Sequence, residues 1–504
     1  MIQAERKSTQ DETPPTGRRT AINLGAQFIS MLGRQGSMAL VSILAARLLG
    51  VTNYGQFSAV TSFVLLFRFV ADWGLQRLVI REVSRNQKAV HRYVSASLLV
   101  LFFANILAIG LIYIAGHIFP ISDGNLGLLL LASLWLVIGE AGMFFSGVFM
   151  AFERMEFDSL ATLAEIIATA IFLSFVFILQ IRSLEILMAV LLAARMINLL
   201  VCIYIYRRYI GTFAPPADLS LSFSIIRATL PFGLQILLAE PANLLVVFTN
   251  QFQGDLATGY FKAALTISLL PTMIAAIFAN VYYPKMSRAY PESPSAFRQL
   301  LQKNIHYMLL IGLPIQAGLW LLAEPIAVFL YGPGFEASAP FIRLLSLTTL
   351  IGFVREALAN GLTSANRQGQ RTAVQAVGMA IAAVIGLVWI PSAGGYGASH
   401  ALNLVRLAML LLFAIISYKT LVGLGQSGWI YPLRLTLPMI FACLVMVGFI
   451  ISSENLHVLI QIAIAGSLYG AILLVCDPMI KQDIRGMNIP SFIQSIWQKR
   501  LKSR

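Results

Sequence analysis

Long apolar runs, each separated from the next by a short polar segment, follow one another along almost the whole chain. Fourteen of them are long enough to cross a membrane as helices, since about 20 residues span the hydrocarbon core. They lie near residues 23–49, 57–79, 93–116, 126–150, 159–180, 184–206, 226–250, 257–283, 304–330, 340–363, 371–391, 396–418, 431–452 and 457–476. The pattern predicts an all-α integral membrane protein with about 14 transmembrane helices.

Composition and charge agree with this prediction. The chain is 58% hydrophobic and 12% charged, whereas soluble domains are about 25% charged. Its net charge of +14 is concentrated before the first run and after runs 2, 6, 8, 10 and 14. By the positive-inside rule, these segments and both termini are cytoplasmic in a multi-pass protein of the cytoplasmic (inner) membrane. The positive charge therefore gives no reason to expect a nucleic-acid partner.

The chain also repeats itself. Tyr54-Gly55-Gln56-Phe57-Ser58-Ala59 matches Thr258-Gly259-Tyr260-Phe261-Lys262-Ala263, 204 positions later. Further on, Ile138-Gly139 matches Ile351-Gly352, and the later arginines Arg154 and Arg367 follow at equal distance. An offset of six helices, an even number, gives both halves the same orientation. We therefore expect two six-helix lobes, related by a pseudo-two-fold axis along the membrane normal, plus two C-terminal helices.

These boundaries divide the chain into five predicted segments. They are a cytoplasmic N-terminal tail (1–22), an N-lobe (23–210), a C-lobe (222–420), helices 13 and 14 (430–477) and a basic cytoplasmic tail (478–504).

Six cationic side chains lie inside the apolar runs: Arg34, Arg68, Arg195, Lys262, Arg355 and Arg406. Each would cost roughly 2.5–3.5 kcal/mol at the bilayer centre if it faced lipid. Most are therefore expected to face the interior of the bundle or a watery cavity. A cationic cavity inside a membrane protein indicates that something anionic enters it.

Several motifs resemble those of a known family. Leu49-Gly50 followed by Asn53-Tyr54-Gly55-Gln56-Phe57 resembles the turn between helices 1 and 2 of polysaccharide-type flippases. Asp72-Trp73-Gly74-Leu75, Leu230-Pro231-Phe232-Gly233 and Tyr283-Pro284-Lys285-Met286-Ser287-Arg288 resemble further motifs of the same proteins, in the same order. The family is the polysaccharide and oligosaccharide-lipid flippase branch of the multidrug/oligosaccharidyl-lipid/polysaccharide exporter superfamily.

This resemblance implies a V-shaped, two-lobe helical fold. It also implies a flippase that moves an undecaprenyl-diphosphate-linked oligosaccharide, such as an O-antigen or exopolysaccharide unit, from the inner to the outer leaflet. The expected partners are this lipid-linked oligosaccharide, the bilayer and glycan polymerase or assembly proteins, and the protein is expected to be a monomer. No catalytic constellation and no metal-ligand spacing is visible. No cofactor is expected, apart from a coupling proton or sodium ion.

Four cations are the candidate substrate-binding residues, because Arg binds phosphate bidentately and Lys binds it as a point charge. They are Arg34, Arg68, Lys262 and Arg355. Alternatives stay open for each: Arg34 could pair with a carboxylate of a neighbouring helix, Arg68 could pair with Asp72 four residues away, and Lys262 could extend to the interface. Arg355 and Glu356 are adjacent and are not expected to face each other.

Arg195 and Arg406 occupy matching positions of the repeat, which favours a structural role for each. The candidate coupling or charge-pair carboxylates are Asp72, Glu140, Glu165 and Glu240. Glu240 precedes Pro241, which is expected to kink its helix and to place this carboxylate where it could hold a coupling ion.

Three functions other than a polysaccharide flippase stay open as alternatives. A flippase for the peptidoglycan lipid precursor would share the fold and the cationic cavity. A cation or drug antiporter on the same fold would need carboxylates more than arginines. A scaffold that recruits glycan polymerases would not depend on the charges of the cavity.

Overall fold

A computed structural model describes residues 17–87, 90–119, 121, 125–212, 219–425, 435–453 and 456–486 of the chain. These residues are mostly helical and include no strand. The helices are α1 (Gly17–Leu66), α2 (Arg68–Asp72), α3 (Leu75–Arg85), α4 (Val90–Ile118), α5 (Leu126–Ala151), α6 (Met155–Ile178), α7 (Leu184–Ile205), η4 (Tyr206–Ile210), α8 (Leu219–Leu238), α9 (Pro241–Leu269), α10 (Thr272–Glu292), α11 (Pro294–Leu321), α12 (Ala323–Tyr331), η5 (Pro333–Ser338), α13 (Ala339–Ser364), α14 (Gln368–Gly423), α15 (Leu437–Ser452), α16 (Val458–Cys476) and α17 (Pro478–Gly486).

The fourteen predicted runs map onto these helices in order. Helix α14 holds two whole runs, α1 holds one whole run and part of the next, and α9 holds parts of two, because these helices continue through a residue with non-helical backbone at Gly394, Gly50 and Gly254. By length and composition, ten of the described helices could cross a membrane, or eleven if α11 and α12, bent by 80°, form one span. Runs 57–79, 226–250, 257–283 and 304–330 are divided between consecutive helices, and each of the other runs falls mainly in one helix. The prediction of an all-α membrane protein with about 14 transmembrane helices is confirmed.

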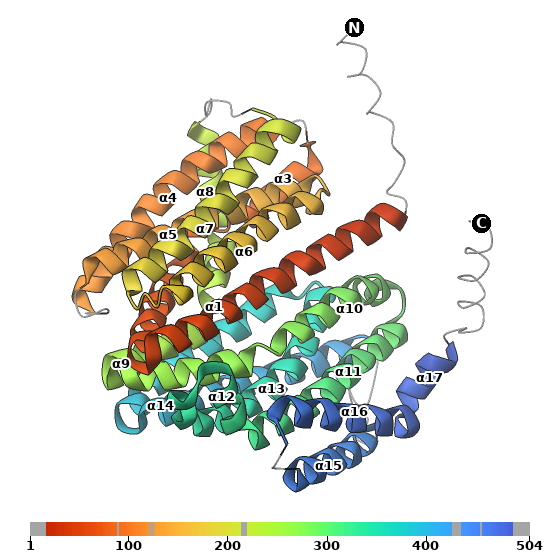
Figure 1. Cartoon of the computed structure of the whole chain (residues 1–504). Helices are drawn as coiled ribbons and strands as arrows, with labels where there is room; N and C mark the ends of the chain where they lie inside the picture. Colours follow the sequence, from red (N-terminus) through yellow and green to blue (C-terminus); the bar gives the residue numbers. More distant parts are fainter. Residues whose placement is uncertain are drawn as a thin grey trace, which may run out of the picture.

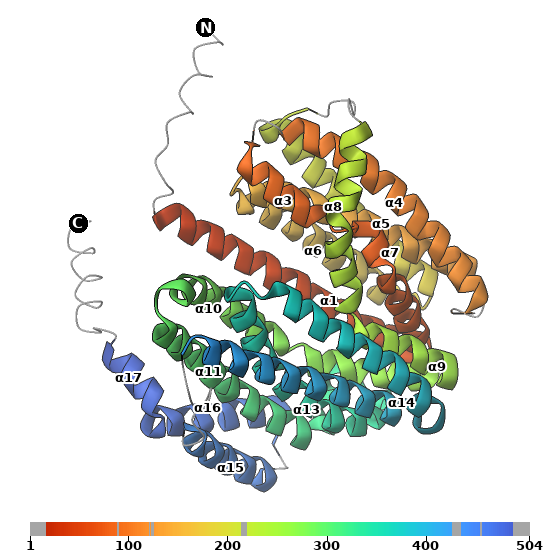
Figure 2. The ribbon, with the colours of Figure 1, turned by 180° about the vertical axis from the view of Figure 1, so that it is seen from behind.

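Two lobes meet at one end and are spread apart at the other (Figures 1 and 2). They converge where α1 and α9 bend, and a single apolar core there contains Tyr54 of α1 and Phe261 of α9. Away from the bends each lobe has its own core, around Phe149 in the first lobe and Phe353 in the second. The separate cores explain how the lobes can be far apart at the end where α1 begins.

Helices α15 and α16 form an appendage on the second lobe. Their buried side chains, which include Met439 and Tyr469, share a small core with Leu322, which ends α11. The Tyr469 hydroxyl donates a hydrogen bond to the carbonyl oxygen of Leu310 in α11 (2.8 Å). Of the predicted terminal tails, 1–16 and 487–504 lie outside the described residues, as does Lys88 of one basic segment.

Helix α8 packs against the first lobe, although its residues follow the predicted lobe boundary. The indole nitrogen of Trp73 donates a hydrogen bond to the carbonyl oxygen of Ile226 (3.4 Å), and Ser222 donates one to that of Ala96 (3.5 Å). The chain passes into the second lobe at Glu240, whose backbone leaves the helical region before Pro241 starts α9. The predicted kink at this proline is present.

Candidate functional site

Two arginines of the first lobe are paired with carboxylates of neighbouring helices. Arg34 of α1 forms an ion pair with Asp158 of α6. Arg68 of α2 places its Nε 2.8 Å from Oε1 of Glu140 in α5, whose side chain is only 5% exposed. Asp72, expected as one partner of Arg68, is buried nearby and interacts with it electrostatically. In this conformation, both arginines are therefore charge-compensated within the lobe.

Arg195 of α7 is held from three sides. Its Nε lies 2.9 Å from Oε1 of Glu165 in α6, and its guanidinium lies 4.8 Å from the centroid of the Trp135 ring. Its terminal nitrogen packs against Gly139 so closely that a Cβ there would overlap it. These contacts link α5, α6 and α7, as expected of a structural charge.

Lys262 connects the two lobes. Its ammonium group lies in α9 and donates a hydrogen bond of 3.1 Å to Ser62 in the first-lobe part of α1. Glu240 interacts electrostatically with both Lys262 and Arg68. The carboxylate at the kink therefore lies between the charges of the two lobes, beside the position where α9 starts.

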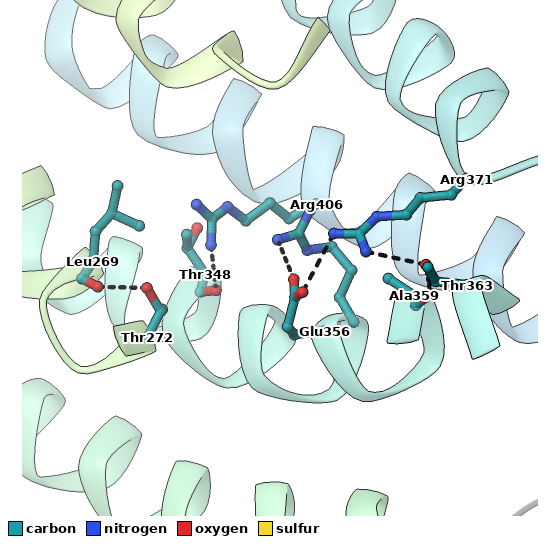
Figure 3. A network of polar contacts seen from close by, with 9 residues as sticks. Leu269, Thr272, Thr348, Glu356, Ala359, Thr363, Arg371 and Arg406 are labelled. Carbon is teal, nitrogen blue, oxygen red and sulfur yellow. Dashed lines mark hydrogen bonds and ion pairs between the residues drawn. The ribbon is translucent and has the colours of Figure 1, made fainter. Parts of the chain in front are cut away.

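The second lobe carries a different arrangement of charges (Figure 3). Nη2 of Arg355 and Nη2 of Arg371 each lie 3.4 Å from an oxygen of Glu356. Arg406 of α14 donates only a long hydrogen bond, 3.4 Å, to the carbonyl oxygen of Thr348. Among the described residues, no carboxylate lies within ion-pair distance of Arg406.

The expectation that Arg355 and Glu356 do not face each other is wrong. Helix geometry directs adjacent Cβ atoms apart, but the long arginine side chain turns back far enough to reach its neighbour. Glu356 thus receives two guanidinium groups, one from its own helix α13 and one from α14.

A polar cavity of about 260 Å³ opens beside these arginines. It lies between α1 and the second lobe and is lined by Gln35, Leu269, Thr272, Met273, Ala275, Ala276, Gly352, Arg355, Glu356 and Arg406. Two guanidinium groups, those of Arg355 and Arg406, line this cavity with the single carboxylate of Glu356, which also pairs with Arg371. The first-lobe cations are instead matched or outnumbered by carboxylates. The arrangement suits reversible binding of an oxyanion, because guanidinium groups bind such groups bidentately.

The structure brings the predicted residues together in two places rather than one. Arg34, Arg68 and Arg195 with Glu140 and Glu165 belong to the first lobe, and Arg355 and Arg406 belong to the second-lobe cavity. Sequence reasoning missed three contributors: Asp158, Gln35 and the pairing of Arg371 with Glu356. Asp158 precedes the predicted run 159–180 by one residue and lies in the first turn of α6. Its position next to this run is the sequence signal that could have identified it.

One of the flippase-like motifs, the one around Tyr54, lies where the lobes meet. The ring of Tyr54 lies 6.1 Å from that of Tyr331 and 5.8 Å from that of Phe335, and Tyr260 lies 6.4 Å from Phe335. Arg47 also crosses this junction, donating to the carbonyl oxygen of Leu330 (2.7 Å). The aromatic cluster closes one end of the molecule.

Comparison with known proteins agrees with this architecture. One solved structure, "Lipid II flippase MurJ, inward closed conformation", matches with a TM-score of 0.72 at 13% identity, over 90% of this chain and 98% of that chain. A multidrug resistance MATE family transporter of the MOP superfamily matches in its inward-facing conformation with a TM-score of 0.61 at 14% identity, over 79% of this chain and 96% of that chain. The outward-facing conformation of such a transporter matches with a TM-score of 0.52 at 13% identity, over 80% and 96%.

The chain therefore shares the fold of the lipid II flippase MurJ and of a MATE transporter of the MOP superfamily. Residues 20–290, more than half of the chain, match the family model described as polysaccharide biosynthesis protein, and the chain belongs to this family. No curated protein sequence matches it. The predictions of this superfamily, and of a transporter rather than an enzyme, are confirmed, because the family and the structural neighbours are transporters and flippases.

Proposed function

We propose that this protein is a flippase for an undecaprenyl-diphosphate-linked oligosaccharide, the repeat unit of a surface polysaccharide such as O-antigen or exopolysaccharide. The observation that carries the proposal is the cavity between α1 and the second lobe, which Arg355 and Arg406 line with the single carboxylate of Glu356, itself also paired with Arg371. A diphosphate supplies the missing negative charge. Membership of the polysaccharide biosynthesis family supports a glycan as the remainder of the cargo.

We infer an inward-open resting state. With the basic segments and both termini on the cytoplasmic side, as the positive-inside rule predicts, the spread end of the lobes faces the cytoplasm. The junction around Tyr54 and Phe335 then closes the outer side. The solved structures that match with TM-scores of 0.72 and 0.61 are titled inward closed and inward-facing, and the outward-facing one matches with 0.52, which supports the inward orientation.

In the proposed cycle, the head group enters from the cytoplasmic side while the prenyl tail stays in lipid. Arg355 is the substrate candidate already exposed to the cavity, and Arg34, Arg68 and Lys262 become available as the lobes rock and their contacts exchange. Reset of the cycle is driven by a proton or sodium ion, with Asp72, Glu140 and Glu240 as its candidate carriers. Alternating access couples the movement of the ion to that of the lipid, because the same site is exposed to each side of the membrane in turn.

The experiment is translocation of a fluorescent undecaprenyl-diphosphate oligosaccharide in reconstituted vesicles. The wild-type protein is expected to move it between leaflets, and Arg34→Ala at matched expression is expected to reduce the rate. An undiminished rate in Arg34→Ala would exclude that residue from the path. Absence of translocation by the wild-type protein would overturn the proposed function.

The second candidate function is translocation of the peptidoglycan lipid precursor. It is favoured by the fold match to the lipid II flippase MurJ over 90% of this chain. The two candidates are separated by offering both lipids in the same vesicles and by complementation of strains that lack each activity. Drug efflux with no effect on either lipid would instead support an antiporter.

A further inference from the structure

We propose that Arg406, together with Arg355, forms the binding subsite for a phosphate group of the substrate. This inference rests on the proposed function, since it assigns the diphosphate of the lipid-linked oligosaccharide to one side of the cavity. It departs from the expectation that Arg406 is a structural counterpart of Arg195. The two lobes differ in the groups that surround this arginine.

The turns that precede α6 and α14 are equivalent in detail. Glu153 and Asn366, 213 positions apart, both have positive φ, 55° and 57°. The next residues repeat the same hydrogen bond: Arg154 N donates to Phe149 O (3.0 Å) and Arg367 N donates to Leu362 O (2.9 Å). Since α6 and α14 continue from here without a break through this region, the helices can be aligned residue by residue.

The two arginines sit on equivalent glycines. Arg195 packs on Gly139, and Arg406 packs on Gly352, where a Cβ would lie 2.9 Å from its Nη1. The offset between the two glycines is the same 213 positions. Both arginines therefore place their guanidinium group over the matching helix of their own lobe, α5 or α13.

The partners are not repeated. Glu165, which neutralises Arg195, corresponds at this offset to Gly378 in α14, where Met409 fills the space. Trp135, whose ring lies against Arg195, corresponds to Thr348, which offers Arg406 only a carbonyl oxygen at 3.4 Å. The second lobe thus keeps the arginine and lacks both groups that stabilise its charge in the first lobe.

An uncompensated cation in a membrane interior is costly, and a nearby cation raises the cost. Arg355 lines the same cavity and interacts electrostatically with Arg406. Its Nε is buried without a hydrogen-bond partner among the described residues. The cavity is therefore lined by two guanidinium groups and one carboxylate, that of Glu356, which Arg355 and Arg371 already share. A phosphate oxyanion accepts from such groups and offsets their charge.

The test measures binding of undecaprenyl diphosphate to the purified full-length protein in nanodiscs. Undecaprenol serves as the uncharged lipid and inorganic pyrophosphate as the lipid-free anion. Loss of a charge-assisted hydrogen bond predicts that Arg406→Gln weakens diphosphate-lipid binding about 10- to 100-fold. Arg406→Lys is expected to lose less, and undecaprenol binding is expected to stay unchanged. Pyrophosphate is expected to bind more weakly than the diphosphate lipid. If Arg406→Gln weakens pyrophosphate binding by the same factor, the site binds the diphosphate head group of the lipid.

Two further variants keep the proposal testable if Arg406→Gln folds poorly. Gln35→Glu adds a carboxylate to the same cavity from an exposed position of α1 and is expected to weaken binding with Arg406 still present. The matched control is Glu165→Gln/Arg195→Gln, which removes the equivalent arginine with its partner and is expected to bind within twofold of wild type. Wild-type affinity in both Arg406→Gln and Gln35→Glu, or an equal loss in the control, would overturn the subsite.

Failure of the subsite and failure of the proposed function give different results. Full translocation by Arg406→Gln would remove the subsite and leave the flippase proposal standing. Diphosphate binding that depends on Arg406, in a wild-type protein that moves no glycan lipid, would leave the subsite and remove the flippase.

Discussion

Gly55 and Gly259 lie on opposite sides of the junction between the lobes, and each contacts the backbone beside the other. A Cβ on Gly55 would overlap the carbonyl oxygen of Asp255, and a Cβ on Gly259 would overlap that of Val51. Both pairs are related by the same shift of 204 positions. The two contacts are therefore copies of one interaction, and the pseudo-two-fold axis passes between them.

This junction gives the first prediction. Gly55→Ala and Gly259→Ala each put a methyl group into a backbone oxygen, which cannot move aside as a flexible side chain would. We expect each variant to open the junction and to lower the translocation rate at least tenfold. A tenfold change in rate corresponds to about 1.4 kcal/mol of free energy. The measurement is the rate in vesicles, together with the distance between spin labels on the two lobes at this end.

Gly36 provides the matched control for these variants. It lies on the same helix α1, and a Cβ there would meet no atom within 4 Å. Gly36→Ala should therefore be neutral or slightly stabilising, because alanine favours helix over glycine. Normal transport and unchanged label distances in Gly55→Ala would contradict the proposed tight contact.

The Glu165–Arg195 pair gives a prediction about stability. The pair is half-buried, with both side chains 22% exposed. Removing one partner leaves an uncompensated charge, so Glu165→Ala is expected to lower the free energy of unfolding by about 1–3 kcal/mol. Glu165→Gln/Arg195→Gln removes both charges and should recover most of this loss. Equilibrium unfolding in detergent measures both values. Equal stability of the single and double variants would mean that the charges are not coupled.

The sequence predicts the fold well because each step depends on local pattern. Apolar runs define membrane helices, since every backbone polar group must be satisfied inside lipid. Matching pairs such as Gly139 with Gly352 define the repeat. Breaks are harder to predict: α2 ends at Asp72 and is followed by Trp73 and Gly74, both with positive φ. Contacts of this turn with α8 hold it in place. The packing of α8 on the first lobe arises from such long-range contacts as well.

The candidate site was predicted only in part, because charge pairing joins residues far apart in sequence. Arg34 and Arg68 could each be recognised as interior charges, yet their partners Asp158 and Glu140 depend on how helices are placed. Arg406 shows the opposite difficulty. The repeat predicts its position correctly, but sequence symmetry does not show that the partner of Arg195 has been replaced by Gly378.

Asp72 gives a prediction about ion coupling. It ends α2, is 5% exposed, and its Oδ1 lacks a hydrogen-bond partner among the described residues. A buried carboxylate of this kind is suited to taking up a cation or proton. We expect Asp72→Asn to lose the acceleration of translocation by an imposed proton or sodium gradient, with less change in the gradient-free rate.

Parallel assays with and without each gradient identify the ion. Glu324→Gln, which changes an exposed carboxylate in the first turn of α12, should keep the acceleration. A full response to both gradients in Asp72→Asn would exclude Asp72 from coupling.

The last prediction concerns helix α17 and pH. Asp483 accepts hydrogen bonds from Lys303 (2.6 Å) and Tyr307 of α11. Burial acts to raise the pKa of Asp483, but these hydrogen bonds and the charge of Lys303 outweigh it and hold the pKa below the ordinary value of 3.8. A carboxylate whose pKa is lower when docked stabilises docking fully above its undocked pKa. That contribution is lost as the pH falls from about 3.8 through the docked pKa.

A spin label on the exposed Gln482 should therefore become more mobile as the pH falls through this range, while a label on Ser452 of α15 reports whether the protein stays folded. Asp483→Asn should show increased mobility already at neutral pH and no further acid transition, because it has no proton to take up. The effect should remain partial, since the buried His306–Asp477 pair (3.0 Å) continues to hold the start of α17. An acid transition of unchanged size in Asp483→Asn would assign the pH response to another group.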